Sequence, residues 1–136
     1  ALDGLSHTIM YAESAGRPQI YQHGIQVQGD ITTVHQNGGG WSRPASDITL
    51  HGSLNDGSQL NGSCPMNCTN GENFPTYGAA PYFTEGTSEI YSFHPGGAHL
   101  LFGDGSVHFI SEVIDIRQLA RLVARADGQS ITGVDF

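Results

Sequence analysis

The pattern of apolar and polar positions is clearest near the C-terminal end, where the runs AHLLF and VHFI flank Asp104-Gly105. An Asp-Gly pair between two β-prone runs predicts a hairpin, because a type I′ turn needs positive φ at both central residues and glycine adopts it without strain. A two-residue turn then pairs Phe102 with Val107 and Leu100 with Phe109. We therefore expect an antiparallel hairpin in this part of the chain.

Side chains alternate between the two faces of a strand, so the predicted pairing also assigns each residue to a face. One face is expected to carry Phe102, Val107, Leu100 and Phe109, and the other His99, Leu101, His108 and Ile110. One of the two faces is expected to pack into the core.

A further β-prone run at 89–93 precedes the hairpin and is joined to it by the turn-forming segment 94–97 (HPGG). The segment of about 89–112 therefore predicts a three-stranded antiparallel meander. His94 and Asp104 would lie at opposite ends of its middle strand, about 20 Å apart at ~3.3 Å per residue. A catalytic acid–base pair needs hydrogen-bond reach, so we expect Asp104-Gly105 to form a turn and His94 to cap its loop.

The period of an amphipathic helix occurs at about 115–126, where apolar residues follow the i, i+3, i+4, i+7 pattern. Asp115 suits the N-cap and Gly128 the C-cap. Arg117, Arg121 and Arg125 recur every four residues and form one basic stripe. Like charges at this spacing repel one another, so acidic partners are expected nearby, either within the chain or on a neighbouring molecule as an interface.

The rest of the chain has less regular patterning. Residues 6–12 are expected to form a strand and residues 25–28 a short edge strand, whereas about 36–82 is mostly loop with one strand-like run at 47–51. The sequence thus predicts one domain spanning 1–136 of the α+β class. It is β-rich, with an antiparallel sheet, one C-terminal helix and long loops in the middle.

Charge and hydropathy exclude two kinds of partner. The chain has thirteen acidic residues, five arginines and no lysine, which gives a formal net charge of −8. Nucleic acid is not an expected partner, because no basic footprint is present to neutralise phosphates. No apolar run reaches the roughly 18–20 residues of a membrane-spanning helix, so no transmembrane segment is expected.

The two cysteines, Cys64 and Cys68, are separated by three residues that include a proline. An even cysteine count in a secreted protein favours a disulfide. A thiolate pair binding zinc is the alternative, but zinc prefers four ligands and the sequence has no second pair. Asn61 and Asn67 each begin an Asn-x-Ser/Thr sequon, so both are formal glycosylation acceptors.

The sequence contains no G-x-S-x-G, HExxH or phosphate-loop motif, so no enzymatic activity and no cofactor are expected. Two metal alternatives stay open. His99 and His108 on one face of the hairpin, with Glu89 or Glu112, would offer transition-metal ligands. The loop at 55–57 (NDG) would suit calcium, although its spacing is not that of an EF-hand. Trp41 or Tyr77, if exposed on a loop, would suit stacking on a carbohydrate.

His94 followed by nine residues and Asp104-Gly105, with the flanking runs FHPGGA and GSVHFISE, resembles the motif of the H-x9-DG prepilin-type family, the planctomycete-type pilin-like proteins. The segment 3–10 with Glu13 is similar to the family's DGxSNTIM…E segment, with His7 where the family usually has Asn. Residues 15–18, 68–70 and 114–117 also match. The resemblance covers most of the chain and is looser from about 22 to 63.

The resemblance implies a pilin-like globular domain that is secreted or displayed at the cell surface and has no assigned enzymatic activity. Proteins of this kind begin with a basic leader, a processing site and a long apolar helix, whereas this sequence starts at Ala1-Leu2-Asp3. We expect it to be the C-terminal part of a longer precursor, a proteolytic product or a specialised member. The packing of pilins through that helix is not carried over.

Two functions follow as expectations. The first is a non-enzymatic structural subunit of an extracellular pilus-like or surface filament, a homo-oligomer built by head-to-tail contacts. The second is a monomeric binding module displayed at the surface, with polysaccharide as its ligand.

Overall fold

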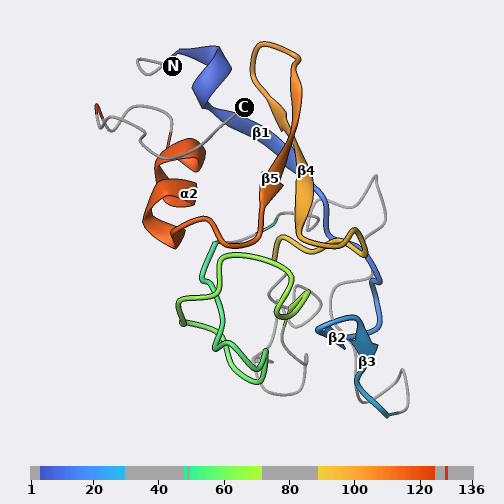
Figure 1. The fold of residues 1–136 in the computed structure, drawn as a ribbon. Helices are drawn as coiled ribbons and strands as arrows, with labels where there is room; N and C mark the ends of the chain where they lie inside the picture. The colour runs from blue at the N-terminus through green and yellow to red at the C-terminus, as the bar shows by residue number, and fades with distance from the viewer. Residues whose placement is uncertain (1–3, 30–47, 49, 72–88, 125–127, 129–136) are drawn as a thin grey trace, which may run out of the picture.

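The C-terminal hairpin lies next to the C-terminal helix and pairs with the N-terminal strand (Figure 1). The computed structural model describes residues 4–29, 48, 50–71, 89–124 and 128. Its elements are η1 (Leu5–His7), β1 (Ile9–Ala12), β2 (Tyr21–Gln22), β3 (Ile25–Gln26), β4 (Gly97–Phe102), β5 (Val107–Ser111) and α2 (Ile116–Val123). A three-stranded sheet in the order β1-β4-β5 and a two-stranded sheet of β2 and β3 are present. Together with the C-terminal helix, these sheets confirm the α+β class.

The third strand of the main sheet is not the one that the sequence predicted. β4 pairs antiparallel with β5 on one edge and with β1 on the other. Residues 89–93, predicted as the first strand of a meander, contribute only an isolated parallel bridge between Ser14 and Tyr91. Glu89, Ile90, Tyr91 and Ser92 are all buried, so this segment is an interior connection and lacks the alternation of a half-exposed strand.

The predicted hairpin is present, but its register is shifted by one residue from the predicted one. The loop has three residues, Gly103, Asp104 and Gly105. The Gly105 N–H donates to the Phe102 carbonyl at 3.0 Å, and the Phe102 N–H donates to the Ser106 carbonyl at 2.9 Å. Gly105 has φ 88°. This is a type I turn followed by a left-handed glycine, the common three-residue alternative to the two-residue turn.

The extra loop residue reverses the faces predicted for β5. Leu101 pairs with Val107, Leu100 with His108, and His99 with Phe109. The inner face of the hairpin therefore carries Ala98, Leu100, Phe102, His108 and Ile110, and the outer face His99, Leu101, Val107 and Phe109. The prediction that His99 and His108 share a face is wrong, because a shift of one residue moves every side chain of a strand to the other face.

The core lies between the inner face of the sheet and α2. Leu119 and Leu122 of the helix are fully buried with Ala98, Leu100 and Phe102 of β4. Asp115 is the N-cap as predicted, since its side chain accepts a hydrogen bond from the Arg117 N–H. The helix ends at Val123 with Ala124 as its C-cap, before the predicted end at 126, so Gly128 is not the cap.

Several other predicted elements are shorter than expected. The predicted strand at 6–12 begins with the 3-10 turn η1 and is extended only at 9–12. The predicted edge strand at 25–28 is β3, which pairs with β2. Residues 50–71 contain isolated bridges and no strand. Of the predicted run at 47–51, only 48, 50 and 51 are described, and none of these is in a strand. In the described part of the chain, no helix combines the length and apolarity needed to cross a bilayer.

Candidate functional site at the His94 loop and the disulfide loop

The loop that carries His94 is held by hydrogen bonds from Ser92. The buried Ser92 hydroxyl donates to the Gly97 carbonyl at 2.6 Å and accepts from the His94 N–H at 3.1 Å. Gly96 has φ 87°, which favours glycine. A Cβ at Gly97 would collide with the Ile110 carbonyl of β5. The HPGG turn is thus fixed directly against the start of the sheet.

The His94 side chain lies beside Glu13 and His99. Glu13 Oε1 is 3.8 Å from His94 Nε2 and 3.5 Å from His99 Nδ1. The other carboxylate oxygen, Oε2, accepts a hydrogen bond from the His99 N–H at 3.1 Å. The two imidazole rings meet edge to face, with their centroids 5.0 Å apart. Two segments distant in sequence, the end of β1 and the segment 94–99, therefore meet at the N-terminal end of β4.

Asp104 lies at the other end of β4, so the six-residue strand Gly97–Phe102 separates it from His94. The Asp104 carboxylate accepts from the Ser106 hydroxyl at 2.6 Å and from the Ser106 N–H at 2.9 Å. These two hydrogen bonds lower the pKa of Asp104 from its usual value. Its contacts are those of a turn residue, because the side chain closes the loop on itself.

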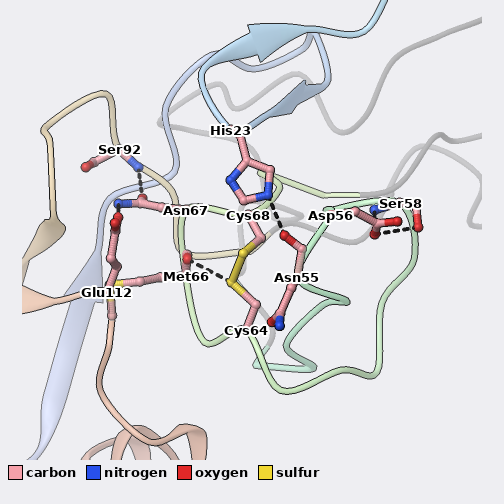
Figure 2. The surroundings of a disulfide bond; sticks show 10 residues. All are labelled: His23, Asn55, Asp56, Ser58, Cys64, Met66, Asn67, Cys68, Ser92 and Glu112. Atoms are coloured by element: carbon pink, nitrogen blue, oxygen red, sulfur yellow. Dashed lines mark hydrogen bonds between the residues drawn. A yellow bond between two sulfur atoms is a disulfide. The ribbon is translucent and has the colours of Figure 1, made fainter.

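The disulfide loop forms the second part of the site (Figure 2). Cys64 and Cys68 are bonded, as the sequence predicted, with their Cα atoms 6.4 Å apart. The Cys64 sulfur lies 3.2 Å from the Met66 carbonyl oxygen. This approach is a contact and not a hydrogen bond, because an oxidised sulfur carries no hydrogen. Both half-cystines are buried, and Met66 belongs to the core.

Asn67, inside the disulfide loop, connects it to the His94 loop (Figure 2). Its Nδ2 donates to the Gly97 carbonyl at 3.2 Å and to Glu112 Oε2 at 2.9 Å, and its Oδ1 accepts from the Ser92 N–H at 2.9 Å. The residue itself has φ 65°. One side chain thus joins the disulfide loop to both ends of the His94 loop and to the chain after β5.

A cleft of about 380 Å³ opens beside the disulfide. His23 lines part of it, with its Nε2 2.6 Å from the Asn55 carbonyl oxygen. Glu112 supplies a carboxylate at its wall. Among the described residues, the cleft is lined by His23, Asn55, Ser63, Cys64, Pro65, Met66, Asn67, Cys68, Glu112, Val113 and Ile114.

Apart from His99, the outer face of the main sheet carries apolar side chains that are partly or largely exposed to solvent. Leu101 at its centre pairs with Tyr11 on β1 and with Val107 on β5. Tyr11 is 67% exposed, Val107 59% and Phe109 46%. We refer to Tyr11, Leu101, Val107 and Phe109 as the outer sheet face.

The structure separates the metal ligands suggested by the sequence. His99 is on the outer face and His108 on the inner one, where its ring packs edge to face on Phe102. Glu112 accepts from Asn67, and Oε1 of the buried Glu89 lies 3.6 Å from His51 Nδ1. Asp56 in the loop proposed for calcium closes on Ser58, whose N–H and hydroxyl donate to it and lower its pKa.

The remaining residues singled out from the sequence differ in exposure, and some lie outside the described part of the chain. Arg117 is exposed, and Arg121 is half-buried with an interaction inside the chain. Arg125, Trp41 and Tyr77 lie outside the described residues. Of the two sequons, Asn61 is exposed, whereas the Asn67 side chain is occupied by three hydrogen bonds.

The sequence did not predict that Glu13 lies beside His94 and His99. The family resemblance singled it out, but no role followed, because 81 positions separate it from His94 in the numbering. The pairing of β1 with β4 brings the two together, and that pairing was not predicted. A glutamate directly after an apolar strand was the only local signal.

Comparison with known proteins gives one match. The model of a family described as "Protein of unknown function (DUF1559)" matches residues 1–117. No curated protein and no solved structure matches the chain. The match includes the segment around Glu13, His94, Asp104-Gly105 and the start of α2. The chain therefore belongs to the DUF1559 family, the H-x9-DG planctomycete-type pilin-like proteins.

Proposed function

We propose that the protein is a non-enzymatic structural subunit of an extracellular, pilus-like surface assembly built from copies of this chain. Membership of a pilin-like family supports this proposal. The observation that carries it is the outer sheet face. A contiguous exposed apolar surface on a soluble domain is typical of an interaction site.

The exposure of the outer sheet face contrasts with the inner face of the same strands. Ala98, Leu100 and Phe102 of β4 are completely buried under α2. On the opposite side, Tyr11, Leu101 and Val107 form one cross-strand row, with more than half of the Tyr11 and Val107 surfaces open. Burying this row against a second copy would stabilise the contact by about 25 cal/mol for each Å² of apolar surface removed from water.

The position of α2 favours a contact that can be repeated. Because α2 packs on the inner face, its exposed side and the outer sheet face lie on opposite sides of the sheet (Figure 1). Two different surfaces on opposite sides allow head-to-tail association, which extends into a filament when the rotation does not close. The exposed Arg117 on α2 would then set the register of the contact through charge.

The test compares assembly of the wild-type protein with that of two separate variants, Tyr11→Asp and Val107→Asp. Each places a carboxylate on the outer sheet face. The matched control is Ile25→Asp, because Ile25 is 72% exposed but lies on β3 of the small sheet. Negative-stain microscopy and light scattering report assembly, and far-UV circular dichroism reports folding.

We expect helical fibres from the wild-type protein and from Ile25→Asp, and dispersed particles from both outer-face variants with unchanged circular dichroism. A wild-type protein that stays monomeric, or outer-face variants that assemble like wild type, would overturn the proposal.

A monomeric binding module is the second candidate, and the cleft beside the disulfide is the observation that favours it. Its polar lining includes Asn55, Ser63 and Glu112, which suit the hydroxyls of a sugar. A monodisperse small particle that binds polysaccharide, and loses binding in Asn55→Ala, would establish this function instead.

A further inference from the structure

Three side chains with metal-binding atoms converge at the N-terminal end of β4. Glu13 follows β1, His94 lies in the HPGG loop, and His99 is the third residue of β4. One ligand atom from each lies within 4.8 Å of the other two, and no other such group of three occurs among the residues that the structure describes. We propose that Glu13, His94 and His99 bind a divalent first-row transition-metal ion, with Zn²⁺ as its probe.

The distances in the cluster fit shared coordination better than a direct ion pair. A hydrogen bond between a carboxylate and a charged imidazole brings the heavy atoms to about 2.7–2.9 Å. Here Glu13 Oε1 is 3.5 Å from His99 Nδ1 and 3.8 Å from His94 Nε2. Two ligands of one tetrahedral zinc, each about 2.0–2.1 Å from the metal, are about 3.3 Å apart. The ligand atoms of His94 and His99 lie within 4.8 Å of each other, so side-chain rotations would bring that pair closer when the metal binds.

The backbone around each ligand is already fixed. The Glu13 carbonyl accepts from the Tyr91 N–H at 2.9 Å, and the His94 N–H is held by Ser92. His99 lies in the β4–β5 ladder opposite Phe109, and its ring packs edge to face on that side chain, with centroids 5.1 Å apart. Support of this kind around the ligands orients them before the metal binds.

The carboxylate is also oriented so that one oxygen faces the two rings. Oε2 accepts from the His99 N–H, which leaves Oε1 directed at His94 Nε2 and His99 Nδ1. The arrangement therefore assigns specific donor atoms to the metal: one carboxylate oxygen, Nε2 of His94 and Nδ1 of His99.

The donor set selects the class of metal. Two imidazoles and one carboxylate suit zinc, copper, nickel or ferrous iron, whereas calcium needs six to eight oxygen ligands. The side chains of His94 and His99 are 55% and 43% exposed, and that of Glu13 is 35% exposed. Coordination positions beyond the three protein ligands thus face solvent and are open to water or to a donor from a neighbouring molecule.

The test is zinc titration of the intact chain. Isothermal calorimetry should show saturable one-site binding of Zn²⁺ and no binding of Ca²⁺. Long-range ¹⁵N–¹H NMR of the imidazoles should show changes at Nε2 of His94 and Nδ1 of His99, with the other histidines unchanged. The NMR readout needs no variant and so does not depend on a variant's folding.

Variants then identify the ligands. His94→Asn and His99→Asn should each weaken zinc binding by about tenfold or more, and Glu13→Gln should weaken it as well. His7→Asn is the matched control, because it removes an exposed imidazole from η1. Circular dichroism checks that each variant is folded. The proposal is overturned if no saturable binding is found, if binding survives both His94→Asn and His99→Asn, or if other histidines respond in the NMR spectrum.

Discussion

Replacing Asn67 tests whether its side chain couples the disulfide loop to the His94 loop. The side chain makes three hydrogen bonds, to Gly97, Ser92 and Glu112. Typical net contributions are about 1 kcal/mol for each neutral bond and about 2 kcal/mol for the bond to a carboxylate. Asn67→Gly removes all three and keeps a residue that tolerates φ 65°. We therefore expect it to lower the free energy of unfolding by about 3 to 4 kcal/mol.

Asn67→Ala separates hydrogen bonding from backbone strain. The Asn67→Ala variant loses the same hydrogen bonds, and the left-handed conformation is unfavourable for alanine by about 1 kcal/mol. Its free energy of unfolding should therefore be lower than that of Asn67→Gly by that amount. Asn61 supplies the matched control. It has φ 67° and is exposed, and its side chain has no hydrogen-bond partner among the described residues. Asn61→Ala should cost about 1 kcal/mol, and Asn61→Gly almost nothing.

The assay is urea unfolding at 25 °C followed by far-UV circular dichroism, with the disulfide kept oxidised. The slope of the free energy against urea should be equal across the four variants, since only then do the midpoints report stability. If Asn67→Gly lies within about 1 kcal/mol of Asn61→Gly, the hydrogen bonds of Asn67 do not hold the two loops together and the reasoning fails.

Three further predictions concern the sheet, a buried tyrosine and the basic stripe. Gly97→Ala should destabilise the fold by about 2 kcal/mol, because its Cβ meets the Ile110 carbonyl. A Cβ at Gly96 would meet open space, but φ is 87° there, so Gly96→Ala should lower the free energy of unfolding by about 1 kcal/mol in the same urea assay. If Gly97→Ala and Gly96→Ala lower it equally, the close approach of Gly97 to the Ile110 carbonyl has no effect on stability. Tyr91→Phe removes the hydrogen bond from the Gly24 N–H and should cost about 1 kcal/mol at neutral pH. Burial raises the pKa of Tyr91 above its usual 10.0, so the unfolded state ionises first and wild-type stability falls as pH rises above that value. The stability difference between wild type and Tyr91→Phe should therefore narrow above pH 10.0 in unfolding measured across pH, and a constant difference would refute this. Arg117→Glu should leave folding unchanged because Arg117 is exposed. It should slow assembly, measured by light scattering, if the basic stripe of α2 contacts an acidic surface of a neighbouring molecule. Assembly at the wild-type rate would show that Arg117 is not part of the interface.

Local chemistry determined the parts of the fold that the sequence predicted correctly. Asp115 caps α2 because its carboxylate reaches the Arg117 N–H two residues later. Cys64 and Cys68 form a disulfide because three residues keep them within bonding reach. Asp104 and Gly105 make a turn because one closes on Ser106 and the other adopts positive φ. Each of these features depends on residues at most four positions apart.

The predicted hairpin register and the predicted third strand were wrong because, in each case, the local sequence suits two alternatives almost equally well. Two-residue and three-residue loops both suit Gly103-Asp104-Gly105, and the observed hydrogen bond from the Phe102 N–H to Ser106 selects the longer one. That single choice separated His108 from His99 and placed His99 opposite Phe109, on the same face of the hairpin. The pairing of β1 with β4, in place of 89–93, depends on how the whole chain packs: Ile9 and Ala12 of β1 pack against the core, whereas Ile90 is buried outside the sheet.

The sequence by itself thus determined the family, the α+β class, the disulfide and the hairpin, because motifs, caps and turns act over a few residues. Only the tertiary structure decided the register, the third strand and the meeting of Glu13 with His94 and His99. Contacts between segments eighty residues apart depend on which surfaces the whole chain can bury together, and no short stretch of sequence specifies that.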